Sequence, residues 1–201
     1  MLQNQEPIFH ITASEFLDEV SKNFINANQF VTDLFTERSR LLVIRLDLGL
    51  RGDSARKYDP YHLRECFNHL LNNRRQKPSL FANCLGYIWS LELGQEKGFH
   101  YHCYFFYDGA YSQQDQNIGH GIGQYWQQVT HSEGTYYCSN DDKAWFEQQG
   151  TCGIGMISRH EVLKRNNLTN LVGYLFKDEA NTRACITSLG LKNIRLYGKG
   201  R

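Results

Sequence analysis

A β-hairpin can be read from residues 89–107, Trp89-Ser-Leu-Glu-Leu-Gly-Gln-Glu-Lys-Gly-Phe-His-Tyr-His-Cys-Tyr-Phe-Phe-Tyr107. Residues 85–93 are rich in apolar and aromatic side chains, and residues 99–107 are almost entirely aromatic. The segment that joins them begins and ends with glycine, which is typical of tight hairpin turns. The pattern therefore predicts two antiparallel strands.

Two histidines and a glutamate fall on one face of this hairpin. Side chains alternate between the faces of a strand, so His100 and His102 share a face. Folding the hairpin about Glu96 places Glu92 opposite His100, where cross-strand Cβ atoms lie about 4.5–5.5 Å apart. Two imidazoles and a carboxylate predict a divalent metal site with positions left open for substrate. The competing interpretation, ordinary sheet histidines, gives no role to the carboxylate.

Length and composition limit the class of protein. The chain has 201 residues and a net charge of +1, so one core is expected and any basic surface must be local, for example at 74–77 or 192–201. A solvated loop or tail is the alternative for both segments. None of the six cysteines forms a Cys-x-x-Cys pair, which argues against a zinc knuckle and favours free thiols in a cytoplasmic protein. No run of about 18 apolar residues and no signal peptide is present, so no membrane partner is expected.

The other periodic segments predict helices and further strands. In chain order they are a helix at 12–25 that opens with a capping box, a helix at 30–37, a strand at 41–50, a helix at 61–75, a glycine-rich stretch at 118–126 leading to a short helix that ends at Val129, short strands at 135–138 and 153–158, a helix at 168–180, and a last strand at 189–197 before a basic tail.

The strand at 41–50 is expected to be central in the sheet. Arg45 and Asp47 share one face, and leucines and isoleucine occupy the other. The polar face is predicted to line a site, and a surface ion pair is the alternative. Strand, helix and hairpin give the order β-α-β-β. We expect a single domain over residues 1–201, with N-terminal helices at 12–38 and an insertion at about 108–155.

A tyrosine in the helix at 168–180 is the candidate nucleophile. The apolar residues Leu168, Leu171, Val172 and Leu175 form one arc of this helix, and Tyr174 lies away from it among polar residues. Lys177 is one turn further along, where an ammonium favours phenolate or stabilises charge on a phosphate. With a metal opposite, these parts predict phosphoryl transfer through a phosphotyrosine. A surface tyrosine beside a solvated lysine is the alternative.

These motifs together resemble a known superfamily. His100-Tyr101-His102 with Glu92, followed by Tyr174-Leu-Phe-Lys177, is similar to the metal and nucleophile motifs of the HUH endonucleases, among them the rolling-circle replication initiators. More narrowly, the chain resembles the inovirus-type gene II-like replication proteins. The matching stretches are Arg45-Leu-Asp-Leu-Gly49, Gly98-Phe-His-Tyr-His102, Ile122-Gly-Gln-Tyr-Trp126, Gly153-Ile-Gly155 and Gly173-Tyr-Leu-Phe-Lys177.

The resemblance implies a fold and an activity. It implies an α+β fold, a central antiparallel sheet with an RRM-like β-α-β-β core flanked by helices. It also implies nicking and joining of single-stranded DNA at the replication origin of a phage or plasmid-like element. Glu92, His100 and His102 would hold Mg²⁺ or Mn²⁺, Tyr174 would attack and Lys177 would assist. The motif has one tyrosine where some initiators have two, so repeated transfer through a pair is not expected.

DNA is the expected partner, as a single strand or an origin hairpin, with a host helicase as an open candidate. Arg45 and Asp47 are the candidate DNA-binding residues. Two alternatives to a replication initiator remain. A transposase or relaxase of the same superfamily would use the same chemistry. A non-catalytic nucleic-acid-binding module would stack bases on Tyr101, Phe105 and Tyr107, and would need neither a metal nor Tyr174.

Overall fold

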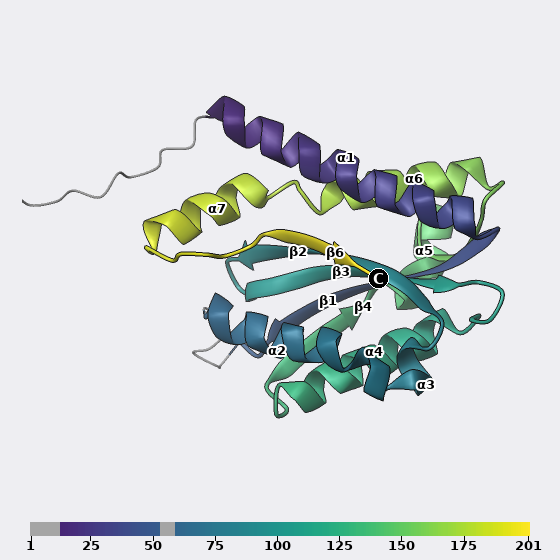
Figure 1. Cartoon of the computed structure of the whole chain (residues 1–201), viewed down its shortest axis with the longest axis horizontal. Coiled ribbons are helices and arrows are strands. Elements are labelled where there is room, and N and C mark those ends of the chain that lie inside the picture. The colour runs from purple at the N-terminus through teal and green to yellow at the C-terminus, as the bar shows by residue number, and fades with distance from the viewer. Residues whose placement is uncertain (1–12, 53–58) are drawn as a thin grey trace, which may run out of the picture.

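One antiparallel sheet organises the computed structural model, which describes residues 13–52 and 59–201 (Figure 1). Its order is β4–β1–β3–β2–β6, and β5 also pairs with β1. This confirms the predicted α+β class and its central antiparallel sheet. The six strands are β1 (Arg40–Leu50), β2 (Cys84–Gly94), β3 (Gly98–Asp108), β4 (Gly134–Cys138), β5 (Gly155–Ser158) and β6 (Tyr197–Gly200).

Helices cover both faces of the sheet. Figure 1 shows α1, α6 and α7 on one side of the sheet and α2, α3 and α4 on the other. The helices are α1 (Ala13–Glu37), α2 (Pro60–Asn72), α3 (Pro78–Phe81), α4 (Asp115–Val129), α5 (Lys143–Gln148), α6 (Val162–Tyr174) and α7 (Glu179–Ser188). Within the described ranges, no helix has both the length and the apolar character needed to cross a bilayer. All six cysteines lie in these ranges, and none of them forms a disulfide.

The aromatic face of β3 belongs to the core beneath α2 and α3. Tyr101, Phe105 and Tyr107 are at most 1% exposed. The ring of Tyr101 stacks on that of Phe67 in α2 with centroids 4.0 Å apart, and the Tyr107 hydroxyl donates to the carbonyl of Leu80. The hypothesis that these three rings form an open platform for bases is therefore wrong, because α2 and α3 bury them.

The glycine-rich stretch at 118–126 lies inside α4, whereas the sequence pattern predicted only a short helix after it. Its glycines allow close packing. A Cβ on Gly119 would lie 2.6 Å from Sγ of Cys138, and a Cβ on Gly123 would lie 2.3 Å from the ring of Tyr136. Both neighbours belong to β4, so the missing side chains let α4 approach the sheet.

Three other boundaries differ from the prediction. Residues 13–37 form one helix rather than two, and the predicted capping box begins at Thr12, outside the described residues. α6 ends at Tyr174, and bonds from Leu175 N to Val172 O and from Phe176 N to Gly173 O form a turn before α7. The last strand is β6, so the residues predicted as a basic tail pair with β2.

A buried asparagine completes the hydrogen bonding of β1. β1 pairs with β5 through residues 40–43 and with β4 through residues 46–50, which leaves a gap between these two strands. Asn140, fully buried, accepts from the backbone N–H of Arg45 and donates to the carbonyl of Val43, both at 2.9 Å. An unpaired buried backbone group is costly, so Asn140 helps to keep β1 extended beside the candidate site.

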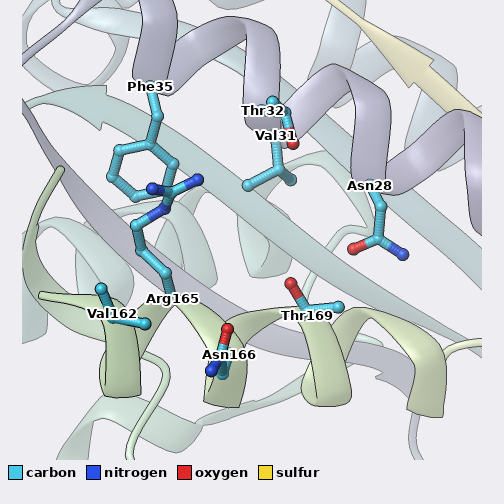
Figure 2. Close-up of a pocket in the computed structure, with 8 residues that line it drawn as sticks. All are labelled: Asn28, Val31, Thr32, Phe35, Val162, Arg165, Asn166 and Thr169. Atoms are coloured by element: carbon cyan, nitrogen blue, oxygen red, sulfur yellow. The ribbon is translucent and has the colours of Figure 1, made fainter. Parts of the chain in front are cut away.

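α1 and α6 lie side by side over the sheet. A hollow of about 140 Å³ between them is lined from both helices, and Arg165 lies against the ring of Phe35 (Figure 2). The guanidinium is 5.1 Å from the ring centroid. None of the described side chains that line this hollow is acidic or a histidine, so it offers no carboxylate or imidazole to a metal ion or to proton transfer.

The close approach of α4 to β4 gives a stability prediction. Gly123→Ala should lower the free energy of unfolding by about 1–3 kcal/mol, because the added methyl group meets the Tyr136 ring. Gly121→Ala is the matched control in the same helix. Its Cβ would meet only the mobile end of Leu80, so stability should stay the same or rise by up to about 1 kcal/mol. Urea denaturation measures both, and equal effects of the two variants would contradict the packing argument.

Candidate metal centre

The strand register brings the predicted metal ligands together. β2 and β3 pair Glu92 directly with His100, as the hairpin pattern predicted. On the other side of β3, β1 pairs Asp47 with His102. Tyr104 and Phe106, which follow the histidines on the same face of β3, pack into the core beneath α1 and α6. The site thus lies on the α1 and α6 side of the sheet, at the end nearest the β2–β3 turn.

Glu92, His100 and His102 form a cluster that could hold a metal ion. One possible ligand atom from each residue lies within 4.8 Å of those of the other two. His100 is 3% exposed, while Glu92 and His102 are half-buried. Two nitrogens and one carboxylate oxygen suit a divalent cation and leave coordination positions for another ligand.

Hydrogen bonds orient both imidazoles. Nδ1 of His100 lies 3.0 Å from the carbonyl oxygen of Gly98, and Nδ1 of His102 lies 2.6 Å from Oδ1 of Asp47. Each Nδ1–H donates to its oxygen, so Nε2 is the nitrogen available for a metal. Nε2 of His102 lies 3.0 Å from Oε2 of Glu92. Such outer partners fix ring orientation in metal sites, and the donor set therefore fits a bound cation.

The charges of the cluster also favour a cation. Burial lowers the pKa of His100 and so favours its neutral form. Burial opposes protonation of His102 too, but its hydrogen bonds to Asp47 and Glu92 prevail and raise its pKa to about 9. The hydrogen bond from His102 lowers the pKa of Glu92. Burial raises the pKa of Asp47, but the hydrogen bond from His102 together with the charges of His102, Arg45 and Lys97 lowers this pKa overall. Two ionised carboxylates thus flank an imidazolium at neutral pH, and a metal ion bound at Nε2 of His102 would displace its proton.

Asp47 has a position that sequence reasoning did not anticipate. The sequence pattern predicts a DNA contact at Asp47, as at Arg45, but the carboxylate of Asp47 lies against His102. Its other oxygen is 3.8 Å from Nζ of Lys97 in the hairpin turn. The alternation along β1 does place Asp47 on a polar face, but only the β1–β3 register reveals its partner.

Arg45 lies on the same face of β1 and is also half-buried. Its guanidinium is 5.8 Å from the centroid of the Tyr104 ring, and its Nε is buried without a hydrogen-bond partner in the part of the chain that the structure describes. Arg45 is therefore less exposed than a side chain that contacts DNA at the surface would be. Its role as a phosphate ligand stays a prediction.

The tyrosine and lysine of the candidate nucleophile motif are in contact. Tyr174 is the last residue of α6 and is 52% exposed. Nζ of Lys177 donates to its hydroxyl at 2.7 Å. The positive charge of Lys177 also helps to lower the pKa of Glu92, so this pair lies within electrostatic reach of the cluster. As predicted, the apolar arc of the helix packs on the protein, with Leu168 and Val172 fully buried.

A hollow of about 250 Å³ adjoins the cluster. Asp47 and His100 form part of its wall, with Lys97 from the hairpin turn and Tyr137 from β4. Tyr137 is 48% exposed, and its hydroxyl donates to Asp142. This hydrogen bond raises the pKa of Tyr137 to about 12, with a smaller contribution from burial. The hollow gives the cluster an open side large enough for part of a substrate.

Comparisons with known proteins identify one family. The model of the family described as the YagK/YfjJ C-terminal domain matches residues 13–184. This range includes Glu92, His100 and His102 as well as Asp47, Tyr174 and Lys177. No curated protein and no solved structure gives a significant match.

The role of Asp47 leads to a prediction about metal affinity. Asp47→Asn removes the charge that holds His102, so Mn²⁺ affinity should fall by about 10-fold to 100-fold, as for other outer partners of metal-bound histidines. His102→Ala should reduce binding further, because it removes a ligand. Asp141→Asn is the control, since that exposed carboxylate pairs with His120 outside the cluster. Isothermal titration calorimetry measures all three, and unchanged affinity in both Asp47→Asn and His102→Ala would rule out this site.

Proposed function

We propose that this chain, which belongs to the YagK/YfjJ C-terminal domain family, is a metal-dependent endonuclease that cuts and rejoins single-stranded DNA. The observation that carries the proposal is the placement of an exposed tyrosine–lysine pair within electrostatic reach of an oriented two-histidine, one-glutamate cluster. The resemblance to HUH endonucleases supports the same conclusion. We further propose that the whole chain forms one nicking domain.

Glu92, His100 and His102 would hold Mg²⁺ or Mn²⁺. A bound divalent cation would neutralise charge on the oxygens of a phosphodiester. Asp47 keeps His102 in the orientation that this requires, and the carbonyl of Gly98 does the same for His100. Gly49 contributes space, since a Cβ there would lie 3.3 Å from Cβ of His100.

Tyr174 would supply the nucleophile. Its hydroxyl oxygen attacks phosphorus and loses its proton, and the bond from phosphorus to the 3′ oxygen breaks. The 3′ oxygen takes the electron pair and a proton, and the 5′ phosphate stays on the tyrosine. Lys177, 2.7 Å from the hydroxyl, stabilises negative charge on the phenol and on the phosphate. The reverse attack by the 3′ hydroxyl rejoins the strand.

Two other tyrosines are poorer candidates for the nucleophile. Tyr197 is 6% exposed, and burial raises its pKa to about 12. Tyr137 is exposed, but its hydrogen bond to Asp142 raises its pKa to about 12. Both environments disfavour phenolate. Tyr174 combines exposure with an ammonium on its hydroxyl, which favours attack by this residue.

The hollow beside His100 suits a nucleotide next to the cleaved phosphate. Lys97 lies in its wall and could contact a neighbouring phosphate, and the exposed ring of Tyr137 offers a surface for a base. We therefore propose single-stranded DNA as the substrate, either free or at the base of an origin hairpin. In this proposal the freed 3′ hydroxyl primes rolling-circle replication of a phage or plasmid-like element, and a host helicase would open the duplex.

The proposed nucleophile predicts a covalent adduct. Wild-type protein incubated with Mn²⁺ and labelled single-stranded DNA should shift in mass on a denaturing gel. Tyr174→Phe removes only the attacking oxygen, so the adduct should disappear while Mn²⁺ and DNA still bind. Tyr111→Phe, at a tyrosine that is 76% exposed, is the matched control and should form the adduct normally. An adduct that persists in Tyr174→Phe would assign the attack to another tyrosine, such as Tyr137 or Tyr197.

Lys177 gives a graded prediction. Lys177→Ala should slow adduct formation on the order of 10²-fold without abolishing it, since removal of one electrostatic donor typically has this effect. Lys177→Arg should recover part of the rate because it restores the charge. Single-turnover kinetics at saturating DNA measure the effect. If Lys177→Ala reacted at the wild-type rate, the lysine would have no part in the step.

A further inference from the structure

The fold joins two basic segments that are far apart in the sequence. Residues 192–201 lie along α2 and the 3₁₀ helix Asn73–Gln76 that follows it. The hydroxyl of Tyr61 bonds to both backbone groups of Lys192 at 2.9 Å, Arg64 donates to the carbonyl of Asn193, and Arg74 donates to the carbonyl of Arg201. The two segments therefore form one surface, which we call the basic edge.

Six cationic side chains define this basic edge. They are Arg64, Arg74, Arg75, Lys192, Arg195 and Lys199. Within the described ranges, none of the six forms an ion pair with a carboxylate, and the hydrogen bonds that their side chains donate go to carbonyl oxygens or to an asparagine. Because the whole chain has a net charge of only +1, this edge concentrates positive charge.

Three of these arginines cover aromatic rings. The guanidinium of Arg74 lies 4.4 Å from the ring centroid of Tyr87, that of Arg64 lies 5.4 Å from Tyr61, and that of Arg195 lies 5.9 Å from Trp89. Stacking on a ring orients the planar guanidinium. It also blocks the ring from a nucleobase, so the surface presents N–H donors suited to phosphates.

The basic edge begins beside the metal-ligand strand. The N–H of Leu91, which precedes Glu92 in β2, donates to the carbonyl of Leu196 at 2.8 Å. From there β6 runs along β2 and ends with Gly200 opposite Tyr87. Four residues of extended strand span about 13 Å, and adjacent strands lie about 4.8 Å apart. A polyanion held at the cluster could thus continue along this edge toward Arg74.

We infer that the basic edge binds the phosphodiester backbone of the DNA on one side of the cleaved bond, without reading its bases. The inference rests on the proposed function, which supplies DNA as the partner. Lysine on an edge strand also discourages pairing with other chains, which would account for Lys199. That role does not account for Arg64, Arg74 and Arg75, which lie on α2 and the following 3₁₀ helix.

Salt-dependent binding tests this inference in the Tyr174→Phe background, where no covalent step occurs. The test variant is Arg75→Gln/Lys192→Gln, which neutralises two exposed side chains of the basic edge. Its affinity for an oligothymidine strand is compared with the parent from about 50 to 200 mM salt. The slope of log affinity against log salt should become shallower by about 1.4, or about 0.7 for each phosphate that the protein no longer neutralises. A mixed-sequence strand of equal length should give the same change.

A matched double variant controls for charge alone. Arg40→Gln/Lys164→Gln also removes one arginine and one lysine, from β1 and α6, and should keep the parental slope. Equal slopes for the parent and both doubles, no binding by the parent, or a change confined to one DNA sequence would overturn the inference. The covalent adduct remains a separate readout. Absence of the wild-type adduct with a reduced slope in the test variant would reject cleavage and keep the basic edge.

Discussion

The imidazole of His102, held between two carboxylates, joins the three strands on which the site depends. Asp47 from β1 accepts from one ring nitrogen and Glu92 from β2 lies beside the other, while His102 itself belongs to β3. This arrangement exists only in one register. A slip of one residue in either pairing would turn the interacting side chains to opposite faces of the sheet. The apolar residues of β1 and β3 enforce the register, because the same slip would expose Leu46 and bury Asp47 without a partner.

The helices on the two faces of the sheet cover different parts of it. α2, α3 and α4 close over the aromatic face of β3, and the glycines of α4 allow this layer to lie close to β1 and β4. On the opposite face, α1 and α6 bury Tyr104 and Phe106, but the cluster lies beyond them toward the hairpin turn. α6 ends at Tyr174, next to the part of the core that contains Tyr104 and Phe106. Tyr174 and Lys177 therefore lie between this core and the Glu92, His100 and His102 cluster. The chain leaves α6 through a hydrogen-bonded turn after Tyr174, and Lys177 in this turn donates to the Tyr174 hydroxyl.

Charged side chains of both signs lie in and around the candidate site. Burial lowers the pKa of His100 and so favours its neutral form. The carboxylates of Asp47 and Glu92 raise the pKa of His102 and so favour a positive charge between them. Positive side chains lie near these carboxylates. Nζ of Lys97 in the hairpin turn is 3.8 Å from Asp47, Lys177 follows the end of α6, and the basic edge lies beyond β2. Carboxylates that attract a cation, with cationic side chains nearby, would suit the phosphodiester substrate proposed above.

The hairpin, the shared face of His100 and His102, and the pairing with Glu92 follow from the sequence alone, because side-chain alternation and turn chemistry act over a few residues. The sequence also indicated the α+β class and the apolar arc beneath Tyr174. It could not show that Asp47 orients His102, that α2 and α3 bury the aromatic face of β3, or that residues 74–77 and 192–201 meet. Each of these depends on contacts between segments separated by dozens of residues. The local hydrophobic pattern does not indicate which strands pair or which helix covers which face of the sheet. They become visible in the folded chain, where burial of apolar side chains sets the strand register and the packing of helices on the sheet.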